Sequence, residues 1–281
     1  MGVGDAQPLP SREYARAPVR LQGMGRVLSR ALFALLLAGP LAAHATAGAA
    51  VRPVAFEHGP RGQRKLALTF DACTTPGPGP YDPRITAELE AMRVPATVFV
   101  SGGWALRERA ALVELARNPL IEIANHSFTH PHLTRIPEPG IREELVRTQE
   151  AIAAVTGRVP TLFRPPYGEY DARVLHVAAE VGLTTVEYDL PSGDPDPRAT
   201  VRSLVEWVLR SARPGSIVVM HINHPRFPTA EALPAIVAGL RARGFELVTV
   251  SELLRTPPIP GRIAGGPPAR AARPAAGPVR A

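Results

Sequence analysis

Residues that could act together in catalysis follow short apolar runs along this sequence. An isolated carboxylate can accept a proton, two histidines spaced four residues apart can share a metal ion, and an arginine can keep a carboxylate ionised. A late histidine near a second acid can donate a proton to a leaving group. Together these residue types predict a hydrolase site. In chain order they are Asp71, His126 and His130, Arg164 with Tyr167, Asp194, and His221.

These residues need a scaffold, and the sequence alternates between strand-like and helix-like segments. Asp82 followed by Pro83 is a strong signal for the start of a helix, and Gly157 ends a long helical pattern. We expect strands at residues 66–70, 96–100, 120–124, 161–163, 184–188, 216–220 and 246–250. We expect helices at residues 82–92, 104–117, 138–155, 171–181, 200–212 and 229–241, with a short last helix from residue 251.

Seven strands alternating with helices predict an α/β domain over residues 51–255, with a parallel sheet covered by helices. The strands are apolar on both faces, as buried parallel strands are. The candidate residues follow the strands, and βα barrels build active sites at the carboxyl ends of their strands. An open doubly wound sheet would also bind ligands there. No glycine-rich dinucleotide motif follows the first strand, so we favour the barrel.

Five motifs resemble, in order, those of the polysaccharide deacetylase family, the NodB-homology enzymes of the carbohydrate esterase family 4 type. The family pattern reads Thr-Phe-Asp-Asp-Gly, His-Ser/Thr-x-x-His, Arg-x-Pro-Tyr, Asp-Trp and Leu-x-His. The corresponding residues here are 69–73, 126–130, 164–167, 194–195 and 219–221. The resemblance covers residues 65 to 254 and implies a distorted (β/α)7 barrel.

The resemblance also implies a role for each residue. Asp71 resembles the base that takes a proton from the attacking water, and His221 resembles the acid that protonates the leaving amine. Arg164 resembles the arginine that holds the base, and Asp194 resembles the acid partner in the fourth motif. The prolines before Tyr167 would fix its backbone N–H toward the developing oxyanion.

A divalent metal ion, most simply Zn²⁺, is the implied cofactor. The spacing of His126 and His130 puts both imidazoles on one face if the backbone turns helically, which suits a shared ion. The family adds the second aspartate of its first motif, where this chain has Ala72. Three outcomes are open, in this order: Asp71 turns to ligate, Cys73 supplies a thiolate, or the metal is lost. A buried structural thiol is the ordinary fate of a single cysteine such as Cys73.

Other positions bear on the substrate side of the site. Pro195 stands where the family has a tryptophan, so the substrate wall on that side differs. Asp189 is a second candidate acid, ranked below Asp194, while His132 and His224 are interpreted as loop residues.

The resemblance implies metal-assisted hydrolysis of N-acetyl groups on an envelope polysaccharide, peptidoglycan or chitin-like glycan. One alternative is a catalytically silent domain that binds glycans on the same scaffold, which Ala72 and Pro195 favour. Another is a hydrolase of a different small amide or imide. The partner in the first two cases is an N-acetylated polysaccharide, and we expect a monomer.

The two ends of the chain differ from its middle. Residues 1–50 are predicted to be an export signal and leader, with Arg26 and Arg30 before the apolar residues 31–39 and a possible cleavage site at 43–45. That apolar run is too short to span a bilayer, so the mature chain would be periplasmic, cell-surface or extracellular without a membrane span. Residues 256–281, rich in proline, alanine and arginine, are predicted to be a disordered tail.

Charge follows the same division. The net charge of +7 comes from the ends, because residues 1–50 carry five arginines against two acids and residues 256–281 carry four arginines and no acid. Residues 51–255 are therefore neutral, which gives no support for nucleic-acid binding. The single cysteine excludes an intramolecular disulfide, so the core alone must stabilise the domain.

Overall fold

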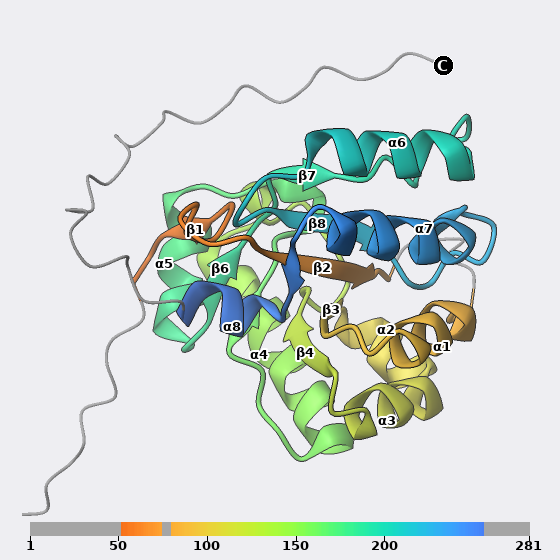
Figure 1. The fold of residues 1–281 in the computed structure, drawn as a ribbon. Helices are drawn as coiled ribbons and strands as arrows, with labels where there is room; N and C mark the ends of the chain where they lie inside the picture. The colour runs from red at the N-terminus through yellow and green to blue at the C-terminus, as the bar shows by residue number, and fades with distance from the viewer. Residues whose placement is uncertain (1–51, 75–79, 256–281) are drawn as a thin grey trace, which may run out of the picture. The chain divides into compact units, whose positions relative to one another are not determined.

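The computed structural model describes residues 52–74 and 80–255, and Figure 1 shows its ribbon. The predicted export signal and the predicted tail lie outside the described residues. The strands are β1 (Ala55–Phe56), β2 (Lys65–Ala72), β3 (Ala96–Val100), β4 (Ile121–Asn125), β5 (Leu162–Phe163), β6 (Thr184–Val186), β7 (Leu190–Pro191), β8 (Ile217–His221) and β9 (Glu246–Leu247). The α-helices are α1 (Pro83–Ala91), α2 (Gly102–Arg107), α3 (Arg109–Arg117), α4 (Glu138–Thr156), α5 (Ala172–Glu180), α6 (Val201–Ser211), α7 (Thr229–Ala242) and α8 (Val250–Arg255).

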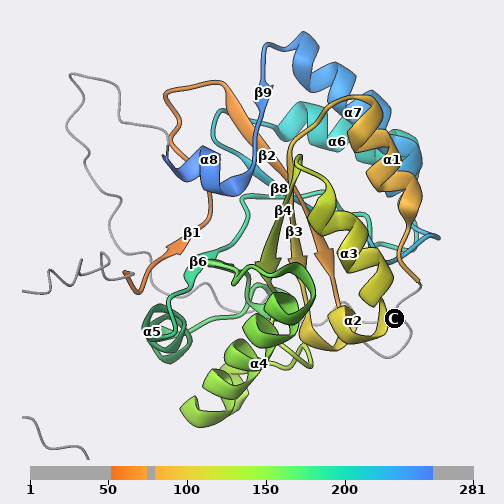
Figure 2. The ribbon, with the colours of Figure 1, turned by 90° about the horizontal axis from the view of Figure 1, so that it is seen from below.

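The strands form one curled parallel sheet in the order β1-β6-β5-β4-β3-β2-β8-β7, with β9 paired to β2. Helices surround the sheet, and the arrowheads of β2, β3 and β4 end on the same side (Figure 2). An antiparallel bridge joins His58, which follows β1, to Ser216, which precedes β8, so the two ends of the sheet approach each other. The fold is the predicted distorted (β/α) barrel, with β1 and β7 as short additional strands.

Each face of β2 packs against a different part of the core. One face contributes to the largest apolar cluster, together with residues of α1, α3, α6 and α7. The β2 residues on this face are Leu66, Leu68, Phe70 and Ala72, all fully buried. Ala67 belongs to a second cluster with Phe99 and Ile217, inside the curl of the sheet. Because neighbouring side chains of a strand point to opposite faces, the inner row of β2 continues with Thr69 and Asp71.

The ends of the helices follow the sequence signals. The Asp82 carboxylate accepts the Arg84 N–H at the start of α1, and Asp171 accepts two backbone N–H groups at the start of α5. Thr200 forms a capping box at α6. Gly157 ends α4 in the left-handed conformation, with φ of 70°.

The expected and observed elements differ in several places. The strand expected at 246–250 ends at Leu247, and Val250 already begins α8. The helix expected over 104–117 is two helices, which meet at Glu108. The strand expected at 184–188 ends at Val186, so Asp189 does not follow it directly. Residues 126–130 form an irregular loop instead of the helical turn assumed for the two histidines. Within residues 52–74 and 80–255, no helix is long and apolar enough to cross a membrane.

Candidate active site

The candidate residues gather at the carboxyl edge of the sheet because neighbouring strands are in register there. Asp71 of β2 lies beside His221 of β8 as its aligned partner. Asn125 of β4 is aligned with Phe163 of β5, so the residues after them, His126 and Arg164, are neighbours as well. Paired residues of a parallel sheet lie about 4.8 Å apart and point to the same face. Strand pairing alone therefore brings four of the predicted residues together.

Asp71 forms a buried ion pair with Arg164. Nη1 of Arg164 lies 2.7 Å from Oδ1 of Asp71 and 2.9 Å from the hydroxyl of Thr69. The guanidinium is fully buried and stacks on Phe99, with 4.0 Å between its carbon and the ring centre. Burial opposes ionisation of Asp71, but Arg164, with His126 and His221, outweighs it and lowers the pKa of this carboxyl group. Asp71 is therefore a carboxylate at neutral pH.

His221 forms the second charged pair. Oδ1 of Asp194 lies 3.0 Å from Nδ1 of His221, and Oδ2 accepts the backbone N–H of His221 at 2.7 Å. The hydroxyls of Ser192 and Thr229 also donate to this carboxylate. Burial opposes the protonation of His221, but Asp194 outweighs it and holds the pKa of His221 well above its usual value. His221 is therefore protonated at neutral pH, with Nδ1 committed to Asp194.

The two other histidines lie beside Cys73. Nδ1 of His126 donates to the carbonyl oxygen of Arg164 at 2.8 Å, because a carbonyl can only accept. Its Nε2 lies 3.6 Å from Sγ of Cys73 and 3.8 Å from Oδ2 of Asp71. The ring centre of His130 is 4.9 Å from that of His126. Potential ligand atoms of Cys73, His126 and His130 all lie within 4.8 Å of one another, and all three residues are buried.

The thiol of Cys73 is surrounded by cationic or polar groups. Burial opposes the thiolate, but interactions with His126, His130 and His221 hold the pKa of Cys73 well below its usual value. Asp71 and Cys73 in turn raise the pKa of His126 against the effect of burial. The side-chain amide of Asn223 donates to the Cys73 carbonyl at 2.9 Å and anchors the backbone here.

Strained backbone is concentrated at this edge. Four non-glycine residues of the described chain have positive φ, and three of them, Ser127, His130 and Tyr167, belong to this site, with φ of 58°, 64° and 62°. Each left-handed residue with a β-carbon costs roughly 1–3 kcal/mol, and such costs accumulate where function requires the geometry. The strain at His130 explains how two histidines can meet without a helical turn.

Tyr167 covers the histidine loop. Its side chain is 52% exposed, its ring lies 4.6 Å from that of His130, and it stacks on His132 at 4.2 Å. Its hydroxyl donates to the carbonyl oxygen of His130 at 3.3 Å. His132, interpreted from the sequence as a loop residue, thus packs against Tyr167 and also contacts Glu169 at 2.8 Å.

Asp189 is separated from the candidate site. Its carboxylate accepts the backbone N–H of Ile217 at 2.8 Å and binds Arg61 at 2.7 Å, so it lies at the amino end of β8. The prediction that Asp189 follows a strand among the candidate residues was wrong, because β6 ends early. His224 is closer to the site: it stacks on Phe227, and their rings lie 6.1 and 5.9 Å from that of His221.

Glu187 is a buried acid that the sequence analysis did not single out. Arg164 donates to its backbone carbonyl, and its Oε1 has no hydrogen-bond partner among the described residues. Burial raises the pKa of Glu187 to about 8, and Arg164 only partly offsets this. Its place directly after the strand β6 is the signal that could have revealed it.

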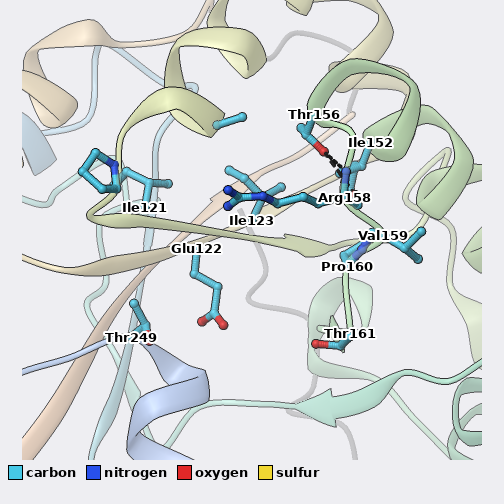
Figure 3. A pocket seen from close by; sticks show the side chains of 12 residues that line it. Ile121, Glu122, Ile123, Ile152, Thr156, Arg158, Val159, Pro160, Thr161 and Thr249 are labelled. Atoms are coloured by element: carbon cyan, nitrogen blue, oxygen red, sulfur yellow. Dashed lines mark hydrogen bonds between the residues drawn. The ribbon is translucent and has the colours of Figure 1, made fainter.

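A pocket of about 280 Å³ lies elsewhere, around the start of β4 (Figure 3). Its lining includes Ile121, Glu122, Thr161 and the exposed Val159. Glu122 accepts hydrogen bonds from Thr97 and from the backbone of Ser251, so its carboxylate is occupied in holding α8. None of the candidate residues lines this pocket, and it presents no chemistry of its own.

Comparison with known proteins agrees with the geometry of the carboxyl edge. A family model described as polysaccharide deacetylase matches residues 58–186, which include Asp71, His126 and Arg164. A chitooligosaccharide deacetylase of Rhizobium leguminosarum bv. trifolii is 34% identical over 215 residues, covering 72% of this chain and 97% of that protein. This chain belongs to the polysaccharide deacetylase family. A peptidoglycan-N-acetylglucosamine deacetylase of Listeria monocytogenes is 32% identical, covering 68% of this chain and 39% of that protein.

The similar solved structures include an esterase and a pseudoenzyme. A family 4 carbohydrate esterase from Streptomyces lividans, in complex with acetate, superposes with a TM-score of 0.58 and 35% identity, covering 65% of this chain and 91% of that one. A CE4 family pseudoenzyme from Bacillus anthracis superposes with a TM-score of 0.67 and 27% identity, covering 73% and 70%. The fold of the polysaccharide deacetylases is therefore shared with proteins that differ in catalytic competence.

Proposed function

We propose that this chain hydrolyses N-acetyl groups of a glycan, with Asp71 as base and His221 as acid. One observation carries the proposal: these two residues are aligned neighbours on β2 and β8, and their pKa values are shifted apart. Arg164 keeps the first ionised and Asp194 keeps the second protonated at the same pH. Neighbouring titratable groups whose pKa values are shifted in opposite directions are typical of a catalytic acid and base.

The proposed steps balance as an amide hydrolysis. Asp71 takes a proton from water through Oδ2, because Oδ1 is engaged by Arg164, and the water oxygen bonds to the acetyl carbon. Charge develops on the carbonyl oxygen, where the backbone N–H of Tyr167 donates. His221 gives its Nε2 proton to the nitrogen as the C–N bond breaks, since Nδ1 is held by Asp194. The products are acetate and a free amine on the sugar.

The family's metal ion fits the residues at this edge. His126 and His130 would hold it, with Asp71 or Cys73 as a further ligand, and the donor set of nitrogen, sulfur and oxygen suits Zn²⁺. When bound, a divalent cation polarises a carbonyl oxygen and lowers the pKa of water.

The substrate class follows from the relatives and from the sequence of the ends. The matched relatives include a chitooligosaccharide deacetylase and peptidoglycan deacetylases, which supports an N-acetylated envelope or chitin-like glycan. The signal-like residues 1–50 support export to the periplasm, cell surface or exterior, where such a glycan lies.

A silent glycan-binding domain is the second candidate, because the chain is also similar to a CE4 family pseudoenzyme. The two functions predict different products. The test incubates purified protein with N-acetylchitooligosaccharides and with peptidoglycan, in the presence of Zn²⁺ or Co²⁺, and measures released acetate.

We expect acetate from wild type and from His176→Gln, whose histidine lies on the exposed surface of α5, and at least about 100-fold less from His221→Gln. Glycan binding by wild type without acetate release from any of these glycans would establish the silent domain instead.

A further inference from the structure

We propose that Cys73 is a metal ligand and that this chain binds its divalent cation through one thiolate and two imidazoles, from Cys73, His126 and His130. The inference concerns the metal ion required by the proposed function, but its test uses no substrate. It replaces the family's ligating carboxylate, whose position Ala72 occupies, by a sulfur one residue further along the chain.

The pleat of β2 favours position 73 over position 72. Thr69 and Asp71 both accept hydrogen bonds from Arg164, so their side chains share the inner face of the strand. Cys73 is the next residue of this alternation, just after β2 ends. Ala72 belongs to the apolar cluster on the opposite face and is fully buried. The thiol therefore continues the row of side chains that line the site.

The orientation of His126 leaves one nitrogen free for a cation. Its Nδ1 hydrogen is committed to the carbonyl oxygen of Arg164, so Nε2 is the coordinating atom. A backbone carbonyl behind an imidazole is a common way in which proteins orient a metal-binding histidine. Nε2 points to Sγ of Cys73 at 3.6 Å, a separation that a tetrahedral ion with bonds of about 2.0 and 2.3 Å can bridge.

His130 is the independent observation that points to a ligand. It is 92% buried, and its Nδ1 has no hydrogen-bond partner among the described residues. An unsatisfied buried polar atom costs roughly 1–3 kcal/mol, and the positive φ of His130 adds strain. One ring nitrogen of His130 is among the ligand atoms that lie within 4.8 Å of one another, so a cation shared with Cys73 and His126 would bind this buried ring.

Asp71 is a poorer third ligand than Cys73. Its Oδ1 is held by the buried Arg164, and it is not part of the three-residue cluster whose ligand atoms lie within 4.8 Å. A carboxylate that stays with Arg164 also stays available as the base. The cluster resembles catalytic zinc sites that use cysteine and histidine and keep an open position for water.

Absorption spectroscopy with Co²⁺ can detect coordination by the Cys73 sulfur. Co²⁺ bound to a thiolate gives a near-ultraviolet sulfur-to-cobalt charge-transfer band, and Cys73 is the only cysteine in the chain, so the band has a single source. The experiment titrates metal-free protein with Co²⁺ and records the spectrum, the bound cobalt per chain and the alkylation rate of the thiol. Wild type is compared with Cys73→Ser and with His176→Gln, and circular dichroism confirms that each is folded.

We expect one cobalt per chain, the charge-transfer band and slower alkylation in wild type and in His176→Gln. Cys73→Ser should lose the band and bind cobalt at least about 100-fold more weakly, since even outer-shell partners contribute 10–100-fold. Cobalt bound by wild type without the band, or no cobalt bound at all, overturns the proposal, and both readouts need only wild-type protein. Absence of deacetylation with an intact thiolate band would overturn the proposed function alone.

Discussion

Two aspartates lie at opposite ends of β8 and show how position decides the role of a carboxylate. Asp189 lies at the amino end, where it accepts the backbone N–H of Ile217 and binds Arg61. Asp194 lies at the carboxyl end, where it accepts both the backbone N–H and the ring N–H of His221. Each carboxylate holds the strand, but only the second also changes the charge of a group that can transfer a proton.

The difference lies in the partners rather than in burial alone. An arginine is already protonated at every relevant pH, so its ion pair with Asp189 adds stability without creating an acid. A histidine near its titration range is converted into a proton donor by a buried aspartate, as for His221. Of these two ion pairs, only the one at the carboxyl edge therefore produces a group that can donate a proton.

The largest expected effect is on the rate of acetate release, and it should differ between variants at the two ends of β8. Asp194→Asn removes the charge that keeps His221 protonated, so the rate of acetate release should fall by about 10²- to 10⁴-fold. Asp189→Asn should leave the rate within a few-fold and instead lower the free energy of unfolding by about 1–2 kcal/mol. Acetate assays and urea unfolding of both variants measure this. Equal rates in the two variants would remove the distinction between the ends of β8.

Arg164→Gln tests how much the buried ion pair with Asp71 contributes to the free energy of unfolding. Removing the guanidinium leaves the buried Asp71 without its partner, so the free energy of unfolding should fall by about 3–5 kcal/mol. Arg61→Gln, at the partly exposed pair with Asp189, is the matched control and should cost about 1 kcal/mol or less. Urea unfolding at pH 7 decides the question, and similar losses in both variants would contradict the burial argument.

Glu187 is a third acid to set beside these two, because it is buried and its Oε1 has no hydrogen-bond partner within the described part of the chain. Its pKa of about 8 in the folded state lies above that of an unfolded glutamate, so the folded state holds the proton more tightly. Stability from this group is present at low pH and is lost as the pH rises from about 4.5 to about 8. Relative to Glu187→Gln, wild type should lose roughly 2 kcal/mol between pH 6 and pH 8. A constant difference would contradict the raised pKa.

Tyr167→Phe has the smallest expected effect. The hydroxyl makes one 3.3 Å bond to the carbonyl of His130, and the proposed oxyanion donor is the backbone N–H, which phenylalanine keeps. Losing one hydrogen bond costs about 1 kcal/mol, so kcat should fall by about fivefold or less. A loss near 100-fold in the acetate assay would show that the hydroxyl itself takes part.

Much of this fold is predictable because local signals and burial agree. The strand expected at 96–100 has the same bounds in the structure. The observed ends of α1 and α4 lie within one residue of the expected ends. The meeting of Asp71 with His221 also follows from the sequence, since parallel strands bring their carboxyl ends to one edge.

Other features depend on geometry that a sequence pattern does not encode. The left-handed residues in the loop 126–130 bring His130 back to His126, and neither serine nor histidine signals positive φ. The strand β7 has only two residues, too few for a pattern, so the side of the sheet to which Asp189 belongs could not be predicted. The side of the sheet to which the Cys73 side chain points depends on whether the alternation of β2 continues past its last residue.

The most direct test of the acid–base site compares two arginine-bound aspartates. Asp71→Asn and Asp189→Asn each remove a carboxylate that lies 2.7 Å from a guanidinium nitrogen, one at each edge of the sheet. Acetate release from N-acetylchitooligosaccharides is measured for both at equal concentrations of folded protein. We predict that Asp71→Asn loses at least about 100-fold in rate while Asp189→Asn stays close to wild type. Acetate release by Asp71→Asn at the wild-type rate would contradict the assignment of Asp71 as the base.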